Sequence, residues 1–200
     1  DGGGGVFELA PAGAAGLVLV APMKEVDWKR RLSAETGQPV TFAMLQVPAA
    51  PDLWKEQMAV ALAATEEGAQ LHPQVAGRPF GVLIGFDTSH PFMLRPSYQA
   101  IAGLPIEERI VELRKPDVKA AILAEENGEG TGALNEGISM LAAGMLDSLY
   151  VLGDPPDYEP TPDRSVAGLA EVAGVSPEEA AYDAFCAEDG RALLMLPLYN

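Results

Sequence analysis

The first eighty residues alternate between two patterns of apolar and polar positions. Residues 24–36 and about 51–66 carry apolar side chains at helical spacing, so each stretch predicts an amphipathic helix. Between them, the run PVTFAMLQV at 39–47 is apolar at both alternating sets of positions, which is typical of a parallel strand covered on both sides. A further strand is predicted at AQLHPQV, residues 69–75. This alternation predicts an α/β fold with a parallel sheet.

Short continuous apolar runs predict more strands elsewhere in the chain. They lie at residues 5–11, 16–22, 80–86 and 190–200. Apolar residues that recur on one side predict a helix at 137–149. The later segment SPEEAAYDAF opens with Ser176, Pro177 and Glu179, a combination typical of a helix N-terminus.

Residues 87–135 interrupt this regular alternation. The stretch DTSHPFMLRPSYQAIAGLP contains three prolines and predicts an irregular path. Two short helices are expected after it, at about 105–114 and 116–126. The glycines of NGEGTG have neither the spacing nor the preceding strand of a dinucleotide-binding loop, so they predict a turn. We interpret 87–135 as a helical and irregular insertion.

Charge and cysteine content narrow the function classes. The 29 acidic and 13 basic residues give a formal net charge of −16 at pH 7. Nucleic acid and anionic membrane surfaces would repel such a chain, so neither is expected as a partner. The single cysteine, Cys186, permits no internal disulfide, and the sequence contains no recognisable signal peptide, so a cytoplasmic protein is expected. Because the chain lacks an initial methionine and stops within a predicted strand, we expect an internal piece of a longer protein.

His72 is the first of only two histidines and raises the question of a metal site. A zinc site usually takes three or four His, Cys, Asp or Glu ligands, and the chain contains neither H-x-H nor H-E-x-x-H. The favoured interpretation is a strand histidine whose ring nitrogens bond to backbone or water. A metal-ligand role for His72 is the weaker alternative.

Four other polar residues are candidates for lining a pocket. Gln46 and Gln74 each lie near the C-terminal end of an apolar strand, where parallel α/β folds carry their sites; each amide either contacts substrate or caps a loop. Arg78, just past the second strand, either clamps a carboxylate or forms a surface salt bridge. His90 lies on a loop after an apolar segment and is the fourth candidate.

The order of several long segments resembles one known family. These segments are LSAETGQPVTFAMLQV, HPQVAGRPFGVLIGF, HPFMLRPSYQAIAGLPIEERIVELRKPDVKAAILAE, LGDPPDYEPTPDRSVAGLAEVAGVSPEEAAYDAF and DGRALLMLPLYN. Together they resemble the D-aminoacylase-like branch of the amidohydrolase superfamily, the N-acyl-D-amino-acid deacylases. The resemblance covers about residues 24–200. Its most specific parts are LPIEERIVELRKPDVKAAIL and the GDPPDYEP…GVSPEEAAYD block.

The resemblance implies the central part of a (β/α) TIM-type barrel that spans residues 1–200, with 87–135 as a lid or pocket wall. It implies metal-dependent hydrolysis of the amide bond in an N-acyl-D-amino acid, a small-molecule substrate. The metal, zinc in the complete protein, activates a water, and a late aspartate shuttles the proton. An early H-x-H pair would lie before residue 1 and the aspartate motif after Asn200, so this chain alone ligates no metal fully and is expected to be inactive. The rest of its own barrel is therefore an expected partner.

Two departures from the family keep a second hypothesis open. Classical members carry a histidine where this chain has Gln46, and a tyrosine where it has His72. The alternative function is therefore a barrel relative that has lost its metal and serves as a binding or interaction module. Tyr98, within the lid-like region, joins Arg78 and His90 as a residue expected to touch substrate. The acyl group, the number of metals and the oligomeric state are left open by the sequence.

Overall fold

The computed structural model describes residues 4–12, 21–46, 50–77, 80–157 and 159–198. The chain forms two compact units. Unit 1 comprises Asp1–Phe80 with Leu198–Asn200, and unit 2 comprises Gly81–Pro197. The predicted strand at 16–22 and the candidate Arg78 lie outside the described residues, except for the end of that strand.

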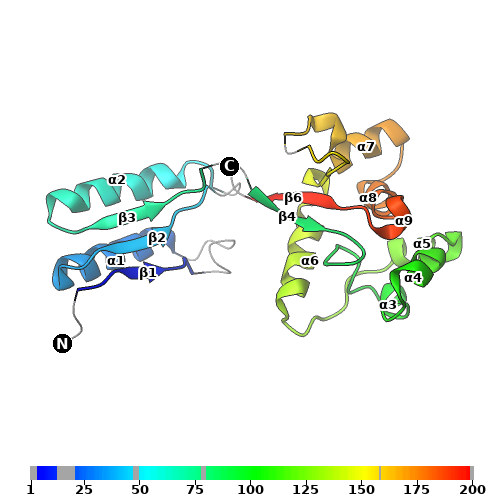
Figure 1. The fold of residues 1–200 in the computed structure, drawn as a ribbon, viewed down its shortest axis with the longest axis horizontal. Coiled ribbons are helices and arrows are strands. Elements are labelled where there is room, and N and C mark those ends of the chain that lie inside the picture. The colour runs from blue at the N-terminus through cyan, green and yellow to red at the C-terminus, as the bar shows by residue number, and fades with distance from the viewer. Residues whose placement is uncertain (1–3, 13–20, 47–49, 78–79, 158, 199–200) are drawn as a thin grey trace. The chain divides into compact units, whose positions relative to one another are not determined.

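Unit 1 is a parallel α/β unit in which a helix connects each strand to the next (Figure 1). Its elements are β1 (Phe7–Leu9), α1 (Pro22–Thr36), β2 (Val40–Ala43), α2 (Leu53–Glu66) and β3 (Leu71–Gln74). The strands lie in the order β1-β2-β3, and both pairs are parallel. The order in space therefore follows the order in sequence.

Both helices of unit 1 pack on the same face of this sheet. Its core contains Val26 of α1, Ala61 and Ala64 of α2, and the strand residues Val40 and Phe42, all nearly fully buried. Lys29 of α1 is also buried, because its ammonium group pairs with Glu25 at 3.0 Å and lies 4.5 Å from the Phe42 ring centroid. Strand side chains alternate between faces, so the intervening residues of each strand face away from α1 and α2.

Unit 2 is mainly helical and contains a second small sheet (Figure 1). Its helices are α3 (Pro96–Gln99), α4 (Ile106–Leu113), α5 (Pro116–Ala124), α6 (Leu134–Gly144), α7 (Val166–Ala173), α8 (Pro177–Phe185) and α9 (Ala187–Gly190), with 3₁₀ turns η2 (Leu146–Ser148) and η3 (Pro162–Arg164). Its strands β4 (Phe80–Ile84), β5 (Tyr150–Val151) and β6 (Leu194–Leu198) lie in the order β4-β6-β5. Strand β5 pairs antiparallel with β6.

Strands β4 and β6 approach each other closely at two glycines. A Cβ atom at Gly81 would lie 2.4 Å from the carbonyl oxygen of Leu196, and one at Gly85 would lie 2.8 Å from that of Ala192. Gly81 faces Leu196, and Gly85, four residues later, faces Ala192, four residues earlier. The two strands are therefore antiparallel. Unit 2 thus lacks the parallel arrangement of unit 1 among its described strands.

Much of the predicted secondary structure is confirmed. The helices at 24–36, 51–66, 105–114 and 116–126 correspond to α1, α2, α4 and α5, and the strand at 39–47 is parallel as predicted. Ser176 caps α8 by accepting a hydrogen bond from the Glu179 N–H at 3.1 Å. The helix predicted at 137–149 is wrong in extent, because α6 ends at Gly144 and Leu149 already has an extended backbone. Gly144 weakens the helix at the point where it ends.

The fold class is mixed α/β, with two three-stranded sheets and no closed barrel among the described residues. The predicted insertion, 87–135, falls within unit 2 and contributes α3, α4 and α5. No described helix has both the length and the apolar character needed to cross a bilayer.

Candidate functional site

The two candidate glutamines lie at the carboxyl end of the parallel sheet in unit 1. Strand β2 ends at Ala43, so Gln46 follows it by three residues and its side chain is exposed. Gln74 is the last residue of β3 and is also exposed. The main chains remain linked here, because the Met44 N–H donates to the Gln74 carbonyl oxygen at 2.9 Å.

The sheet face opposite α1 and α2 carries small and polar side chains. We define the open face as Glu8, Thr41, Ala43, His72 and Gln74. Residues Glu8, Thr41 and His72 stand in register on three neighbouring strands, and Ala43 is in register with Gln74. Each is exposed or half-buried in the part of the chain that the structure describes. The open face is therefore accessible to solvent or to a ligand.

His72 is an exposed residue in the middle of β3. Its backbone carbonyl accepts hydrogen bonds from the Thr41 hydroxyl at 3.0 Å and from the Gln74 amide at 3.3 Å. Its imidazole has no hydrogen-bond partner among the described residues. The backbone of His72 is thus part of the sheet, whereas its ring is available to a ligand.

The other two candidates with described positions, His90 and Tyr98, lie together in unit 2. Their ring centroids are 4.3 Å apart, in an edge-to-face arrangement. His90 is completely buried among aromatic rings, with the Phe86 centroid at 5.0 Å and the Phe185 centroid at 6.3 Å. The two rings are therefore neighbours, and His90 lies inside a core and not on an accessible surface.

The hydrogen bonds of His90 define its chemical state. Its Nδ1 accepts a hydrogen bond from the Phe92 N–H at 3.3 Å, which assigns the ring proton to Nε2. Nε2 is buried without a hydrogen-bond partner among the described residues. Burial, and secondarily the positive charge of Arg109, lowers the pKa of His90 to about 3. His90 is therefore neutral near pH 7.

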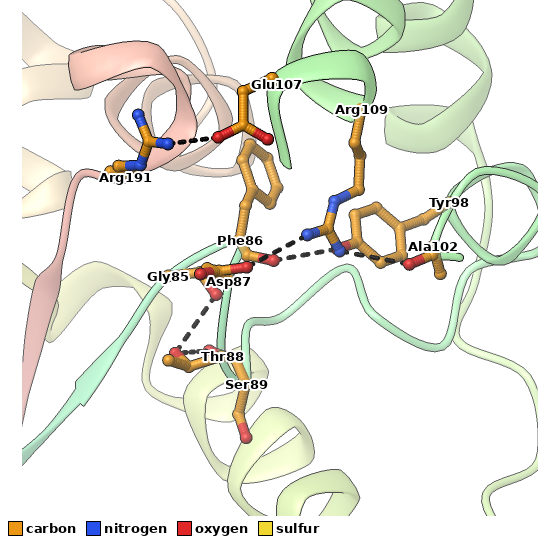
Figure 2. Close-up of polar contacts among 10 residues, drawn as sticks. All are labelled: Gly85, Phe86, Asp87, Thr88, Ser89, Tyr98, Ala102, Glu107, Arg109 and Arg191. Carbon is orange, nitrogen blue, oxygen red and sulfur yellow. Dashed lines mark hydrogen bonds and ion pairs between the residues drawn. The ribbon is translucent and has the colours of Figure 1, made fainter. Parts of the chain in front are cut away.

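Arg109 of α4 connects Tyr98 to the turn that follows β4 (Figure 2). Its Nη1 donates to the Tyr98 hydroxyl at 3.0 Å and to the Ala102 carbonyl at 3.4 Å. Its Nη2 lies 3.4 Å from the Asp87 carboxylate. The Tyr98 hydroxyl in turn donates to the Phe86 carbonyl at 3.2 Å. We call Phe86, Asp87, His90, Tyr98 and Arg109 the buried network.

Burial dominates the electrostatics of the buried network. It raises the pKa of Tyr98, and the nearby Arg109 charge offsets part of that effect. The Arg109 side chain is only 11% exposed, whereas that of Asp87 is 65% exposed. The phenol, the imidazole and the guanidinium are therefore held in place by packing and by backbone carbonyls. This arrangement stabilises unit 2, and the Asp87 carboxylate is the one largely accessible group among these five residues.

Sequence reasoning missed Arg109, the residue that links these groups. Arg109 lies eleven positions after Tyr98 and twenty-two after Asp87, and no local motif joins them. The only available signal was amphipathicity, because Arg109 falls on the same side of α4 as the buried residues Ile106, Ile110 and Leu113. A cation at such a position needs a buried partner.

A separate groove in unit 2 lies between α4, α5 and α8, with a volume of about 580 Å³. Lys119 lies in it and pairs with Glu179 at 2.9 Å and with Asp183 at 2.8 Å. Cys186 also lines the groove, and burial, followed by the charge of Asp183, raises the pKa of its thiol to about 11. The thiol is therefore a poor nucleophile, and the lysine already has its counter-charges.

The described residues do not supply a metal site. Among them, no three His, Cys, Asp or Glu residues come together in a way that could hold a metal ion. His72 consequently has no second and third ligand in this part of the chain. Comparisons with protein families, curated proteins and solved structures found no match to the chain.

Proposed function

We propose that this chain belongs to a (β/α) barrel, to which its parallel unit, unit 1, contributes three strands and one wall of the active site. The observation that supports this most strongly is the sequential order β1-β2-β3, with both connecting helices on one face. A (β/α) barrel places each strand beside the next in sequence and puts its helices outside. A doubly wound sheet instead reverses its strand order and carries helices on both faces.

The polarity of the two sheet faces supports the same proposal. The face toward α1 and α2 is apolar, as the outer side of barrel strands must be where helices cover them. The open face has a carboxylate, a hydroxyl, an imidazole and an amide. In a barrel this face points inward, and residues at the carboxyl ends of its strands reach the site.

For the complete protein we propose metal-dependent hydrolysis of a linear amide, most specifically the deacylation of N-acyl-D-amino acids in the cytoplasm. The proposal rests on the ordered segments between residues 24 and 200 that resemble that family. Since the described residues lack a metal donor set, we assign the zinc ligands and the proton-shuttling aspartate to sequence outside this chain. Within the chain, Gln46 and Gln74 line the wall, and the buried network holds the insertion in shape.

The test is an assay of the protein that carries residues 1–200 together with the flanking sequence in its gene, which we call the flanked protein. Release of free amine from N-acetyl-D-amino acids is measured, with the L enantiomers as the stereochemical control. We expect turnover of the D series, loss of turnover with a chelator and recovery with zinc. Residues 1–200 alone are expected to give no turnover, and activity from that piece would contradict the assignment of the metal ligands.

A second candidate function is a binding or interaction module on a barrel that has lost its metal. The exposed amide of Gln46, at a position where the resembled family carries a histidine, favours it. The same assay separates the two proposals. If the flanked protein binds no zinc and turns over no N-acyl amino acid of either hand, hydrolysis is excluded and the binding module is the better description.

A further inference from the structure

The open face holds hydrogen-bond donors at one side and a carboxylate at the other. Glu8, Thr41 and His72 stand in register on β1, β2 and β3. Since neighbouring strands lie about 4.8 Å apart, the strand positions of Glu8 and His72 are separated by roughly 10 Å. A small molecule that lies across the three strands would therefore meet a different chemistry at each end.

The donors gather on β3. His72 and Gln74 are two positions apart on one strand, so their side chains lie on the same face. The Gln74 amide donates one N–H to the His72 carbonyl, which draws this side chain along the strand toward His72 and leaves its second N–H available. The His72 ring has no hydrogen-bond partner among the described residues. Ala43, in register with Gln74, adds only a methyl group beside it.

Thr41, the central residue of the three in register, already makes a structural contact. The Thr41 hydroxyl donates its proton to the His72 carbonyl at 3.0 Å, so it has no proton left to donate to a ligand. On the far side, the Glu8 carboxylate would repel an anion. A carboxylate that binds to the open face is thus directed to β3 and away from β1.

We propose that His72 and Gln74 bind the carboxylate of the N-acyl amino acid, and that Glu8 keeps this carboxylate on the β3 side of the face. This inference rests on the proposed deacylase function and adds which residues recognise the amino-acid end of the substrate. His72 and Gln74 are substrate-binding residues here, and Glu8 sets the orientation. No proton transfer or metal contact is assigned to them.

The experiment compares carboxylate and carboxamide substrates in the flanked protein. His72→Ala and Gln74→Leu are each expected to raise KM for an N-acetyl-D-amino acid by about tenfold or more, because each removes a hydrogen bond to a charged group. The kcat is expected to change little, since the lost contact exists both before and during the reaction. The corresponding N-acetyl-D-amino acid amide lacks the carboxylate, so its KM is expected to be insensitive to both substitutions.

Two further variants make the result specific. His72→Gln retains a donor and is expected to recover part of the affinity that His72→Ala loses. Glu8→Gln is expected to lower KM for the carboxylate substrate by a fewfold at low salt, because it removes a repulsion. Glu56→Gln, at an exposed position on α2, is the matched control and is expected to change nothing.

Different failures have different meanings. If His72→Ala raises KM equally for the carboxylate and the carboxamide, or changes neither, the carboxylate-binding role is wrong while the deacylase function stands. If the unsubstituted protein turns over no N-acyl amino acid, the deacylase function fails and this inference falls with it. Loss of folding is recognised separately by the thermal melt of each variant, which we expect to match the unsubstituted protein because these side chains are exposed.

Discussion

The two histidines of this chain show how differently its two units use the same chemical group. His72 lies on a parallel strand of unit 1, exposed on a face that the described helices leave uncovered. His90 lies in unit 2, fully buried among aromatic rings and with its pKa lowered to about 3 by burial and by Arg109. One imidazole is available to a ligand, and the other is part of a core.

This difference separates polar side chains that are exposed from polar side chains that support a core. Unit 1 displays its polar side chains in register on a sheet, where a ligand could contact several at once. Unit 2 pairs its polar side chains with one another and with backbone carbonyls, as the Arg109–Tyr98–Phe86 contacts illustrate (Figure 2). A charged or titratable residue in an unfamiliar sequence is therefore informative about function only once its exposure is known.

The largest expected effects come from removing the aromatic residue at the centre of each core. Phe86→Ala and Phe42→Ala each empty a site that is no more than 2% exposed, so each is expected to lower the free energy of unfolding by about 3–5 kcal/mol. Both tryptophans, Trp28 and Trp54, belong to unit 1, so their fluorescence during urea unfolding reports the Phe42→Ala effect. Amide hydrogen exchange within 85–113 reports the effect of Phe86→Ala.

The Phe86→Ala variant also tests whether the aromatic residues of unit 2 have the structural role that distinguishes His90 from His72. If Phe86→Ala leaves exchange in 85–113 unchanged, the aromatic cluster around His90 does not stabilise unit 2.

Acid is expected to destabilise the folded protein through His90. The folded-state pKa of His90, about 3, is below the ordinary value of 6.5, so between those values the unfolded chain binds more protons at this residue. The stability contributed by neutral His90 is fully present above about pH 6.5 and is lost as the pH falls toward 3. At pH 5 the expected loss is about 2 kcal/mol, at roughly 1.4 kcal/mol per pH unit.

The measurement is the urea-unfolding free energy of His90→Phe between pH 5 and pH 8, relative to the unsubstituted protein. His90→Phe keeps an aromatic ring without a titrating group, so its stability is expected to fall less in acid. Equal acid dependence in the two proteins would contradict the burial of a neutral His90.

A smaller effect is expected from the hydroxyl group that joins Arg109 to the turn after β4. Tyr98→Phe keeps the ring against His90 but removes the acceptor for Arg109 Nη1 and the donor to the Phe86 carbonyl. We expect a loss of about 1–2 kcal/mol, because buried polar groups then lose a partner. Thermal unfolding measures it, and an unchanged midpoint would show that the hydroxyl is dispensable.

The local patterns of this sequence predicted helices and strands better than they predicted the environment of individual side chains. Alternating apolar positions identified β2, and Ser176 with Glu179 identified the start of α8, because both signals act within a few residues. The burial of His90 was not predicted, since a histidine between serine and proline on a loop looks like a surface residue. Its environment is made by Tyr98 and Phe185, which are distant in sequence.

The candidate site shows the same limit. Gln74 was correctly placed at the end of a strand, whereas β2 ends earlier than its apolar run and leaves Gln46 beyond it. The alignment of Glu8 with Thr41 and His72 depends on strand register, which no single segment of the sequence specifies. Which residues of neighbouring strands lie side by side could therefore be seen only in the structure.

The close approach of β4 and β6 limits which amino-acid substitutions this protein tolerates. At Gly81 and Gly85 the space that a methyl group would need is occupied by main-chain oxygens, which cannot move aside as a side chain can. In a library containing every single substitution, these positions should therefore accept almost no replacement, alanine included. Two positions four residues apart that reject even alanine, with the 41% exposed Leu83 between them accepting polar residues, would be a genetic signature of this strand pair that can be read without any structure.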